Sequence, residues 1–398
     1  MGHQLSSSSC LATTIPPEIL VEMITLCSKG WDRRSNGGNT IRYTHVCRYW
    51  RAVITSTPIL WTTFLIGLPL EEDEAESVRR GNYVAFLAKE YARVSHQVER
   101  TKDVPFSALF HSLIDNVAVH PAADLLVQHH HQWRQAFLGV TALQSLVRHY
   151  ENRSEREQEL WKFTNLRTLA VTLSDNVSDE AQTTVFVLQD ADPFLHATRL
   201  KYLVLCCVSG GLKYSWPQLT SLLLDNLTLS LIYIKEALVQ CMSPETLHLG
   251  GLTIADEDSA TITPPITLPR LHSVFRTYSG RAQAEPGEDT DDGVLLAALH
   301  VPSLTQLMLS GPSSTYEGAG ICLAQSSTTE LVKIMFVDVS FPDRADGGAS
   351  FTLNILQAAP KLQALFITFA EDNDGNEYDP DAGEADLVIH MRLLLERF

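Results

Sequence analysis

One short hydrophobic motif recurs along this chain and constrains its fold more than any other feature. The motif is Leu-x-x-Leu-x-Leu, in which another large apolar residue replaces some of the leucines. Successive copies begin about 19 to 34 residues apart, which is typical of an internal structural repeat. Clear copies begin at Leu166, Leu200, Leu219, Leu304, Leu331 and Leu362, and weaker copies begin at Pro244 and Leu271.

The spacing within the motif has a physical cause. A short strand that turns its first, fourth and sixth residues toward the interior can stack on parallel neighbours, which buries these side chains continuously. Parallel strands need long crossover connections, and helical patterns fill several intervals between copies. We therefore predict an α/β fold over residues 77–370. Its expected covering helices include Asp179–Gln189, Leu231–Cys241, Gly293–His300 and Ser350–Ala358.

The segment before the first clear copy continues this alternation of helices and strands. Apolar residues at helical spacing predict helices over Val84–Val98 and Ala122–His130. Short runs rich in large residues predict strands over Val104–Phe110 and from Trp133 to Leu138.

Residues 15–66 follow a different, helical pattern. Thr14 can cap a first helix that has Pro17 in its first turn, and a second helix is predicted over Thr40–Thr55. Roughly fifty residues enclose little core, so part of the apolar surface of this segment should face a partner.

Three short sequences within this segment resemble the F-box, the helical module that docks on the Skp-type adaptor of SCF (Skp–cullin–F-box) ubiquitin ligases. They are Ile15-Pro-Pro-Glu-Ile-Leu20, Val46-Cys-Arg-Tyr-Trp-Arg51 and Pro58-Ile-Leu-Trp61. The chain departs from the family at Ile15, where leucine is usual, and in its long polar loop Ser28–Thr40. The resemblance implies that the adaptor-binding residues are Ile15, Pro16, Pro17, Ile19, Leu20, Ile24, Val46, Trp50, Leu60 and Trp61. Of these, we expect Ile15, Leu20, Leu60 and Trp61 to be exposed in the isolated chain.

The whole chain resembles fungal F-box proteins that carry a degenerate leucine-rich-repeat body. The resemblance implies an irregular leucine-rich-repeat solenoid behind the F-box, and a non-enzymatic protein without a cofactor. Such a protein binds the Skp-type adaptor and cullin-based ligase core through its head and a target protein through its solenoid. Two alternatives stay open, namely a repeat scaffold without ligase association and an enzyme whose site assembles only in three dimensions.

The residues between the interior positions of each motif should point onto a shared outer face. We predict that a target offering acidic or hydrogen-bonding groups binds there. The candidate residues are Arg167, Lys201, Tyr202, Gln306, Lys333 and Gln363.

Charge and composition narrow the classes of partner. The net charge of −17 argues against general nucleic-acid binding, because phosphate contacts need clustered lysine and arginine. Seven cysteines without C-x-x-C spacing favour reduced thiols, and no apolar run is long enough to span a membrane. We therefore expect a cytoplasmic or nuclear protein. Residues 1–14 should form a disordered leader, and residues 371–398 an acidic loop with a capping helix.

Catalytic and metal-binding motifs are weak in this sequence. His129, His130 and His131 are adjacent but lack metal-ligand spacing. Asp372 and Asp374 imitate the start of a calcium loop, but its later glycine and glutamate positions do not match. No nucleophile elbow and no phosphate-binding glycine loop is present. We predict no metal site and no catalytic residues.

Overall fold

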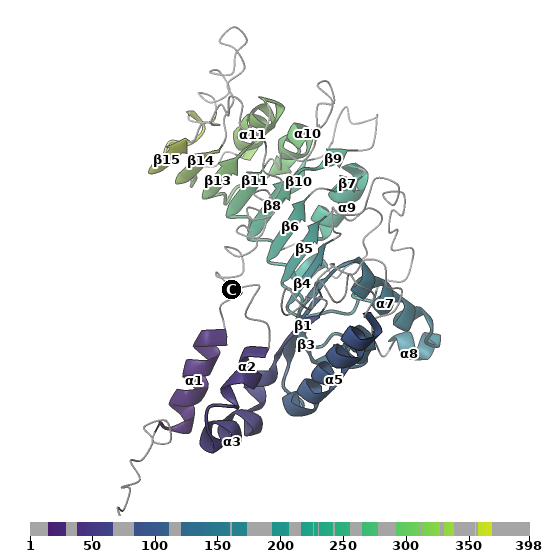
Figure 1. The fold of residues 1–398 in the computed structure, drawn as a ribbon. Helices are drawn as coiled ribbons and strands as arrows, with labels where there is room; N and C mark the ends of the chain where they lie inside the picture. The colour runs from purple at the N-terminus through teal and green to yellow at the C-terminus, as the bar shows by residue number, and fades with distance from the viewer. Residues whose placement is uncertain are drawn as a thin grey trace, which may run out of the picture.

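The structure is a computed structural model of the 398-residue chain. It has an α/β architecture built on one eleven-stranded parallel sheet (Figure 1). The strands of this sheet lie side by side in chain order, so every strand between its two ends pairs with the preceding and the following strand of the same sheet. The structure describes residues 15–28, 38–66, 83–110, 121–159, 161–172, 193–206, 216–225, 227–229, 231–241, 243–254, 265–277, 292–310, 313–326, 330–337, 355 and 357–367.

The head, residues 15–62, contains three short α-helices and a 3-10 helix. These are α1 (Pro17–Ser28), α2 (Gly38–Tyr43), α3 (Arg48–Ser56) and η2 (Pro58–Trp61). The single helix predicted over Thr40–Thr55 is wrong, because a turn divides it. In that turn the Thr44 hydroxyl donates to the Ile41 carbonyl at 2.6 Å, and the Cys47 sulfur caps α3 by accepting from the Trp50 amide at 3.5 Å.

The body begins at Thr63 and contains the sheet. Residues 63–66, which the sequence analysis assigned to the head, form its first strand and therefore belong to the body. The strands of the large sheet are β1 (Thr63–Ile66), β2 (Phe106–Phe110), β3 (Trp133–Leu138), β4 (Thr168–Thr172), β5 (Tyr202–Cys206), β6 (Ser221–Asp225), β8 (Thr246–Gly250), β11 (Ser273–Thr277), β13 (Gln306–Leu309), β14 (Lys333–Phe336) and β15 (Ala364–Ile367). Two small parallel pairs join β7 (Thr228–Leu229) to β9 (Thr253–Ile254) and β10 (Ile266–Thr267) to β12 (Leu299–His300).

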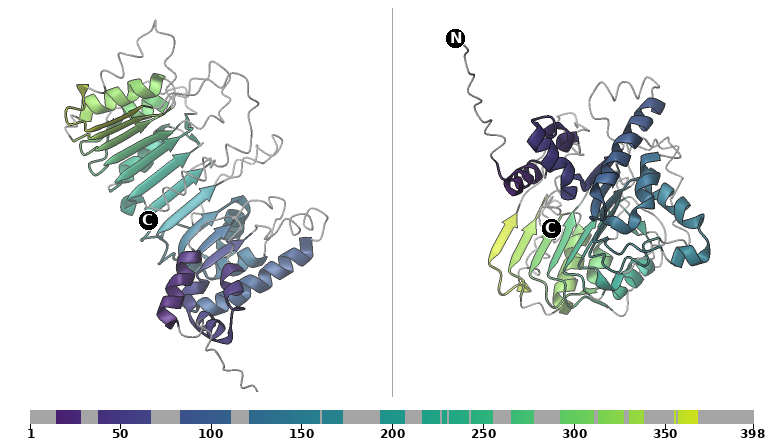
Figure 2. Two further views of the ribbon diagram at one scale, coloured as in Figure 1. Left: turned by 60° about the vertical axis from the view of Figure 1, so that its left-hand side comes forward. Right: turned by 90° about the horizontal axis from the view of Figure 1, so that it is seen from below.

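The helices of the body lie on one face of the sheet (Figure 2). Helices α5, α6, α9 and α10 confirm predictions, whereas α7 and α11 were not predicted. The segment Asp179–Gln189 and most of Ser350–Ala358 lie outside the described residues. The helices are α5 (Tyr83–Thr101), α6 (Pro121–Gln128), α7 (Val140–Glu151), α8 (Glu155–Glu159), α9 (Leu231–Gln240), α10 (Asp292–Ala297) and α11 (Ser313–Ser326), with short 3-10 turns η3 (His130–Gln132) and η4 (Trp216–Gln218).

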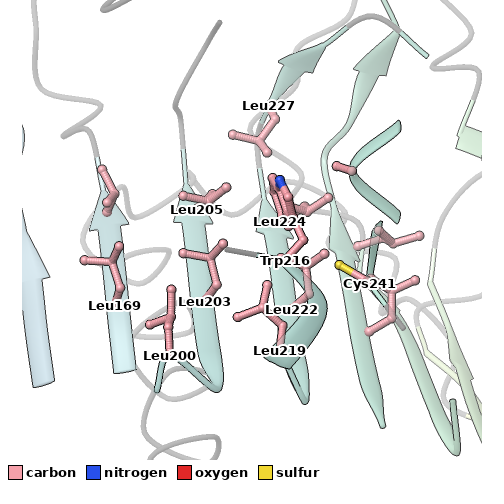
Figure 3. Close-up of a cluster of buried hydrophobic side chains, with 14 of the residues drawn as sticks. Leu169, Leu200, Leu203, Leu205, Trp216, Leu219, Leu222, Leu224, Leu227 and Cys241 are labelled. Carbon is pink, nitrogen blue, oxygen red and sulfur yellow. The ribbon is translucent and has the colours of Figure 1, made fainter. Parts of the chain in front are cut away.

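The core lies between the sheet and these helices, and the motif positions fill it as predicted. Leu203 and Leu222 are aligned on neighbouring strands (Figure 3). Leu247 is aligned with Leu222 on the next strand of the sheet, and all three residues are 1% exposed or less. Arg276 departs from the motif in residue type, because it replaces the last apolar residue of its copy. It is nevertheless buried, and its guanidinium donates to the Thr277 carbonyl.

The last motif copy is an exception to the buried pattern. Leu365 and Ile367 are each 41% exposed, although they occupy the interior positions of that copy. They lie on β15, which comes last in the sheet among the described residues and has β14 as its paired neighbour there. A strand with a neighbour on one side alone cannot bury its side chains as completely as a central strand.

Polar contacts join the head to the body. The Gln97 amide on α5 donates to the carbonyl oxygens of Trp61 (3.1 Å) and Thr63 (2.7 Å). The guanidinium of Arg100 lies over the Trp61 ring, 4.9 Å from its centroid. The Trp61 indole in turn donates to the Ile54 carbonyl at 2.9 Å, so Trp61 links α3 of the head to α5 of the body.

Candidate partner-binding surfaces

Helix α1 of the head has two apolar faces. Leu20 and Ile24 point inward and are at most 2% exposed, packing with Ile54 and Trp61 in a small core of the head. Three other apolar side chains of α1 face outward, whereas Val21 is half-buried. Ile19 is 49% exposed, Met23 43% and Leu26 60%, and these residues are spaced four and three positions apart, so they line one side of the helix.

Other elements of the head also expose apolar side chains. Burying one large apolar side chain contributes about 1.5–3 kcal/mol of free energy relative to leaving it in water. A partner protein that covers several such side chains of the head at once would therefore bind favourably. The exposed residues outside α1 are Ile41 on α2, Val46 in the turn before α3 and Ile59 on η2.

The predicted adaptor-binding residues divide into three groups. Pro16, Pro17, Ile19 and Val46 are exposed, and Ile15, Trp50 and Leu60 are half-buried. Leu20, Ile24 and Trp61 are buried, so the predicted exposure of Leu20 and Trp61 is wrong. The physical reason is that a segment this short needs its largest inward side chains for its own core.

The half-buried residues of the head are held by specific contacts. The Tyr49 hydroxyl on α3 donates to the Ile15 carbonyl at 2.7 Å, which ties the chain before α1 to α3. The Leu60 carbonyl accepts a hydrogen bond from the Thr40 hydroxyl at 3.2 Å. These contacts fix both ends of the head around its core.

The second candidate surface is the sheet face opposite the helices of the body. Strand register aligns Tyr202, Gln306 and Lys333 in one row across this face, as the motif predicted. Arg167, Lys201 and Gln363 each stand one residue earlier and are exposed. The structure therefore arranges the predicted target-binding residues in two neighbouring rows.

A largely apolar row that sequence reasoning missed runs beside these residues. Its members occupy the fifth motif position, whose side chains share the outer face with those of the third position. At the far end Phe366 is 49% exposed, and the Lys333 ammonium lies 5.5 Å from its ring centroid. The row contains Leu65, Leu109, Phe137, Ala170, Val204, Leu223, His248, Phe275, Met308, Met335 and Phe366.

The three adjacent histidines do not converge on a metal. The His130 ring stacks on Trp161 at 3.9 Å with planes 4° apart, and its Nδ1 lies 3.1 Å from the Val127 carbonyl oxygen. Burial lowers the pKa of His130 to about 4, so it is neutral at pH 7. No group of three or more potential metal-ligating side chains occurs among the described residues.

A serine, an aspartate and a histidine meet between α6 and α7. The Ser145 hydroxyl donates to Asp124 Oδ1, and His149 Nε2 lies 3.2 Å from the same oxygen. Activation of a serine needs the histidine between the hydroxyl and the carboxylate. Here the carboxylate lies between the other two groups, so the arrangement joins two helices rather than preparing a nucleophile.

Two buried cysteines, Cys241 and Cys322, are poor nucleophiles. Burial raises the pKa of Cys241 and of Cys322 to about 12, which leaves almost no thiolate at neutral pH. The cysteines in the described part of the chain are all free thiols.

Comparisons with known proteins leave the family of this chain open. No protein-family model matches the sequence, and no curated protein matches it significantly. In the described part of the chain, no helix combines the length and the apolar character needed to cross a bilayer. The predicted features at residues 1–14 and 371–398, including Asp372 and Asp374, lie outside the described residues.

Proposed function

We propose that this chain is the substrate-recognition subunit of an SCF-type ubiquitin ligase. The head is the F-box and docks on the Skp-type adaptor of a cullin-based core, while the body is a leucine-rich-repeat solenoid that holds a target protein. The chain itself supplies proximity and orientation, and ubiquitin transfer takes place on other subunits.

One observation carries this proposal, namely the outward apolar face of α1. Ile19, Met23 and Leu26 expose 43–60% of their surface on a helix whose opposite face already packs in the head core. The helix begins at Pro17, within the first of the three F-box-like sequences. An apolar helix face of this kind suits a hydrophobic interface with a second protein.

The body supports the second half of the proposal. Parallel strands that pair in chain order, with crossover helices on one face, direct the third and fifth motif positions to the other face. Ala170, Leu223 and His248 are buried in the middle of that face, so the extended binding surface that we propose consists of its exposed and half-buried residues. The head joins the sheet at its β1 edge, whereas the candidate target residues extend from β4 to β15 (Figure 1). Adaptor and target can therefore bind the same chain simultaneously. The free cysteines suit the reducing cytoplasm or nucleus.

Affinity purification of the tagged full chain from cells, followed by mass spectrometry, tests this function. The proposal predicts recovery of the Skp-type adaptor and the cullin together with target proteins. Recovery of partners without adaptor or cullin would instead support a scaffold that has no ligase association.

A further inference from the structure

Three basic residues form a row along the amino-terminal ends of strands β3, β4 and β5. Arg134 lies in β3, and Arg167 and Lys201 directly precede β4 and β5. The Arg167 amide donates to the Arg134 carbonyl at 2.8 Å, and the Lys201 amide donates to the Arg167 carbonyl at 2.9 Å. Because neighbouring strands lie about 4.8 Å apart, the three positions span roughly 10 Å.

These side chains are exposed, and their charges are not neutralised by the fold. Within the residues that the structure describes, none of the three side chains makes a hydrogen bond or an ion pair. Like charges on directly neighbouring strands repel and destabilise a sheet. A row of three such charges is therefore a cost to folding that a bound anion would remove.

The row is also local and contrasts with the rest of the chain. The same position is occupied by Thr220 before β6 and by Glu245 before β8, so the basic run ends at β5. The whole chain carries a net charge of −17. An anionic partner is repelled by most of the surface and attracted to this row, so the charges orient the partner as it approaches the chain.

The length of the row favours several separate negative charges over a single one. One phosphate group is much shorter than the roughly 10 Å between the outer strands. An extended peptide places alternate side chains about 6.6–6.8 Å apart, a spacing that long arginine and lysine side chains can match. Arginine also binds a carboxylate through two parallel hydrogen bonds.

We infer that Arg134, Arg167 and Lys201 bind an extended acidic segment of the target, with carboxylate side chains at alternating positions. This inference rests on the proposed function only in taking the bound protein to be the ligase target. Lys333, which was grouped with Arg167 and Lys201 from sequence, lies over Phe366 at the far end of the sheet and is not part of this row.

The test uses the full chain and a fluorescein-labelled peptide that alternates glutamate with serine. Fluorescence anisotropy is measured for the wild type and for a variant in which Arg134, Arg167 and Lys201 are each changed to Glu. The control variant carries Lys102→Glu, Arg156→Glu and Arg270→Glu, which are exposed positions elsewhere on the body. Both variants change the net charge by the same amount, so they separate a local site from a general charge effect.

The row variant should bind the glutamate peptide about tenfold more weakly than the wild type, and the control variant less than twofold more weakly. A lysine–serine peptide, which can bind the acidic surface of the chain, should bind the row variant at least as tightly as the wild type. Equal affinities of the two variants, with both folded by circular dichroism, would overturn the inference. The assignment to carboxylates would be overturned if the wild type bound a peptide whose one charged side chain is a phosphoserine more tightly than it binds the glutamate peptide. The assay contains no adaptor, so a failure of the ligase proposal would not alter its result.

Discussion

Helices α10 and α11 approach each other so closely at Gly318 that the structure predicts a strong effect of adding one methyl group. A Cβ atom at Gly318 would lie 2.0 Å from the carbonyl oxygen of Gly293 and 2.7 Å from its carbonyl carbon. Ordinary Cβ contacts are longer than 3.0 Å, so the two backbones would have to separate by about 1 Å. These helices supply buried Leu295 and Leu323 to the core, and that packing would loosen.

The expected magnitude follows from two opposing effects. Alanine favours a helix over glycine by about 1 kcal/mol, whereas overpacking typically costs about 1–3 kcal/mol. Since the clash involves backbone atoms that cannot rotate away, overpacking should prevail. We expect Gly318→Ala to lower the free energy of unfolding by up to about 2 kcal/mol.

Gly320, two residues later in the same helix, provides a matched control. A Cβ atom there would meet no atom within 4 Å, so Gly320→Ala should raise the free energy of unfolding by about 0.5–1 kcal/mol. Urea unfolding followed by tryptophan fluorescence measures both variants. If Gly318→Ala stabilised the chain as much as Gly320→Ala, the close approach of the two helices would be refuted.

Two further predictions concern the body. Leu222→Ala should lower the free energy of unfolding by about 2–5 kcal/mol, because Leu222 is 1% exposed. Ser221→Ala, on the other face of the same strand, should change it by less than about 0.5 kcal/mol, and similar urea midpoints for the two variants would argue against this strand register. The pKa of His130 is lowered in the folded chain, so the unfolded chain takes up this proton at higher pH than the folded chain does. The free energy of unfolding should therefore fall as pH drops from 6.5 toward 4, by about 1.5 kcal/mol between pH 6.5 and 5. His130→Gln should reduce this dependence. A pH slope in urea titrations equal to that of the wild type would contradict the assigned environment of His130.

The repeat motif predicted the parallel strands and their interior positions because burial on one side of a strand leaves a strict period in the sequence. Leu203, Leu222 and Leu307 are buried as their motif positions require. The same reasoning could not recognise β15 as an edge strand, because edge position depends on which neighbours the fold provides. Leu365 is therefore exposed although its motif looks like the others.

Candidate binding residues in the head were harder to predict. Leu20 and Ile19 are adjacent aliphatic residues of α1, and only the packing of α1 on α3 and η2 decides which of them is buried. The spacing of Ile19, Met23 and Leu26 was a usable signal, because it marks a second apolar side of the helix. The basic row needed strand register, since Arg134 lies outside the clear motif copies.

The proposal that the head docks on the Skp-type adaptor is tested most directly by the affinity of the full chain for the purified adaptor, measured by isothermal titration calorimetry. A variant with Ile19, Met23 and Leu26 each changed to Asp should bind at least about 30-fold more weakly than the wild type, because truncating interface anchors often costs about 2 kcal/mol or more. The matched control changes Val84, Val239 and Ile321, exposed apolar residues on helices of the body, to Asp and should bind like the wild type. Absence of adaptor binding by the wild type, or equal binding by the two folded variants, would contradict the assignment of the head as an F-box.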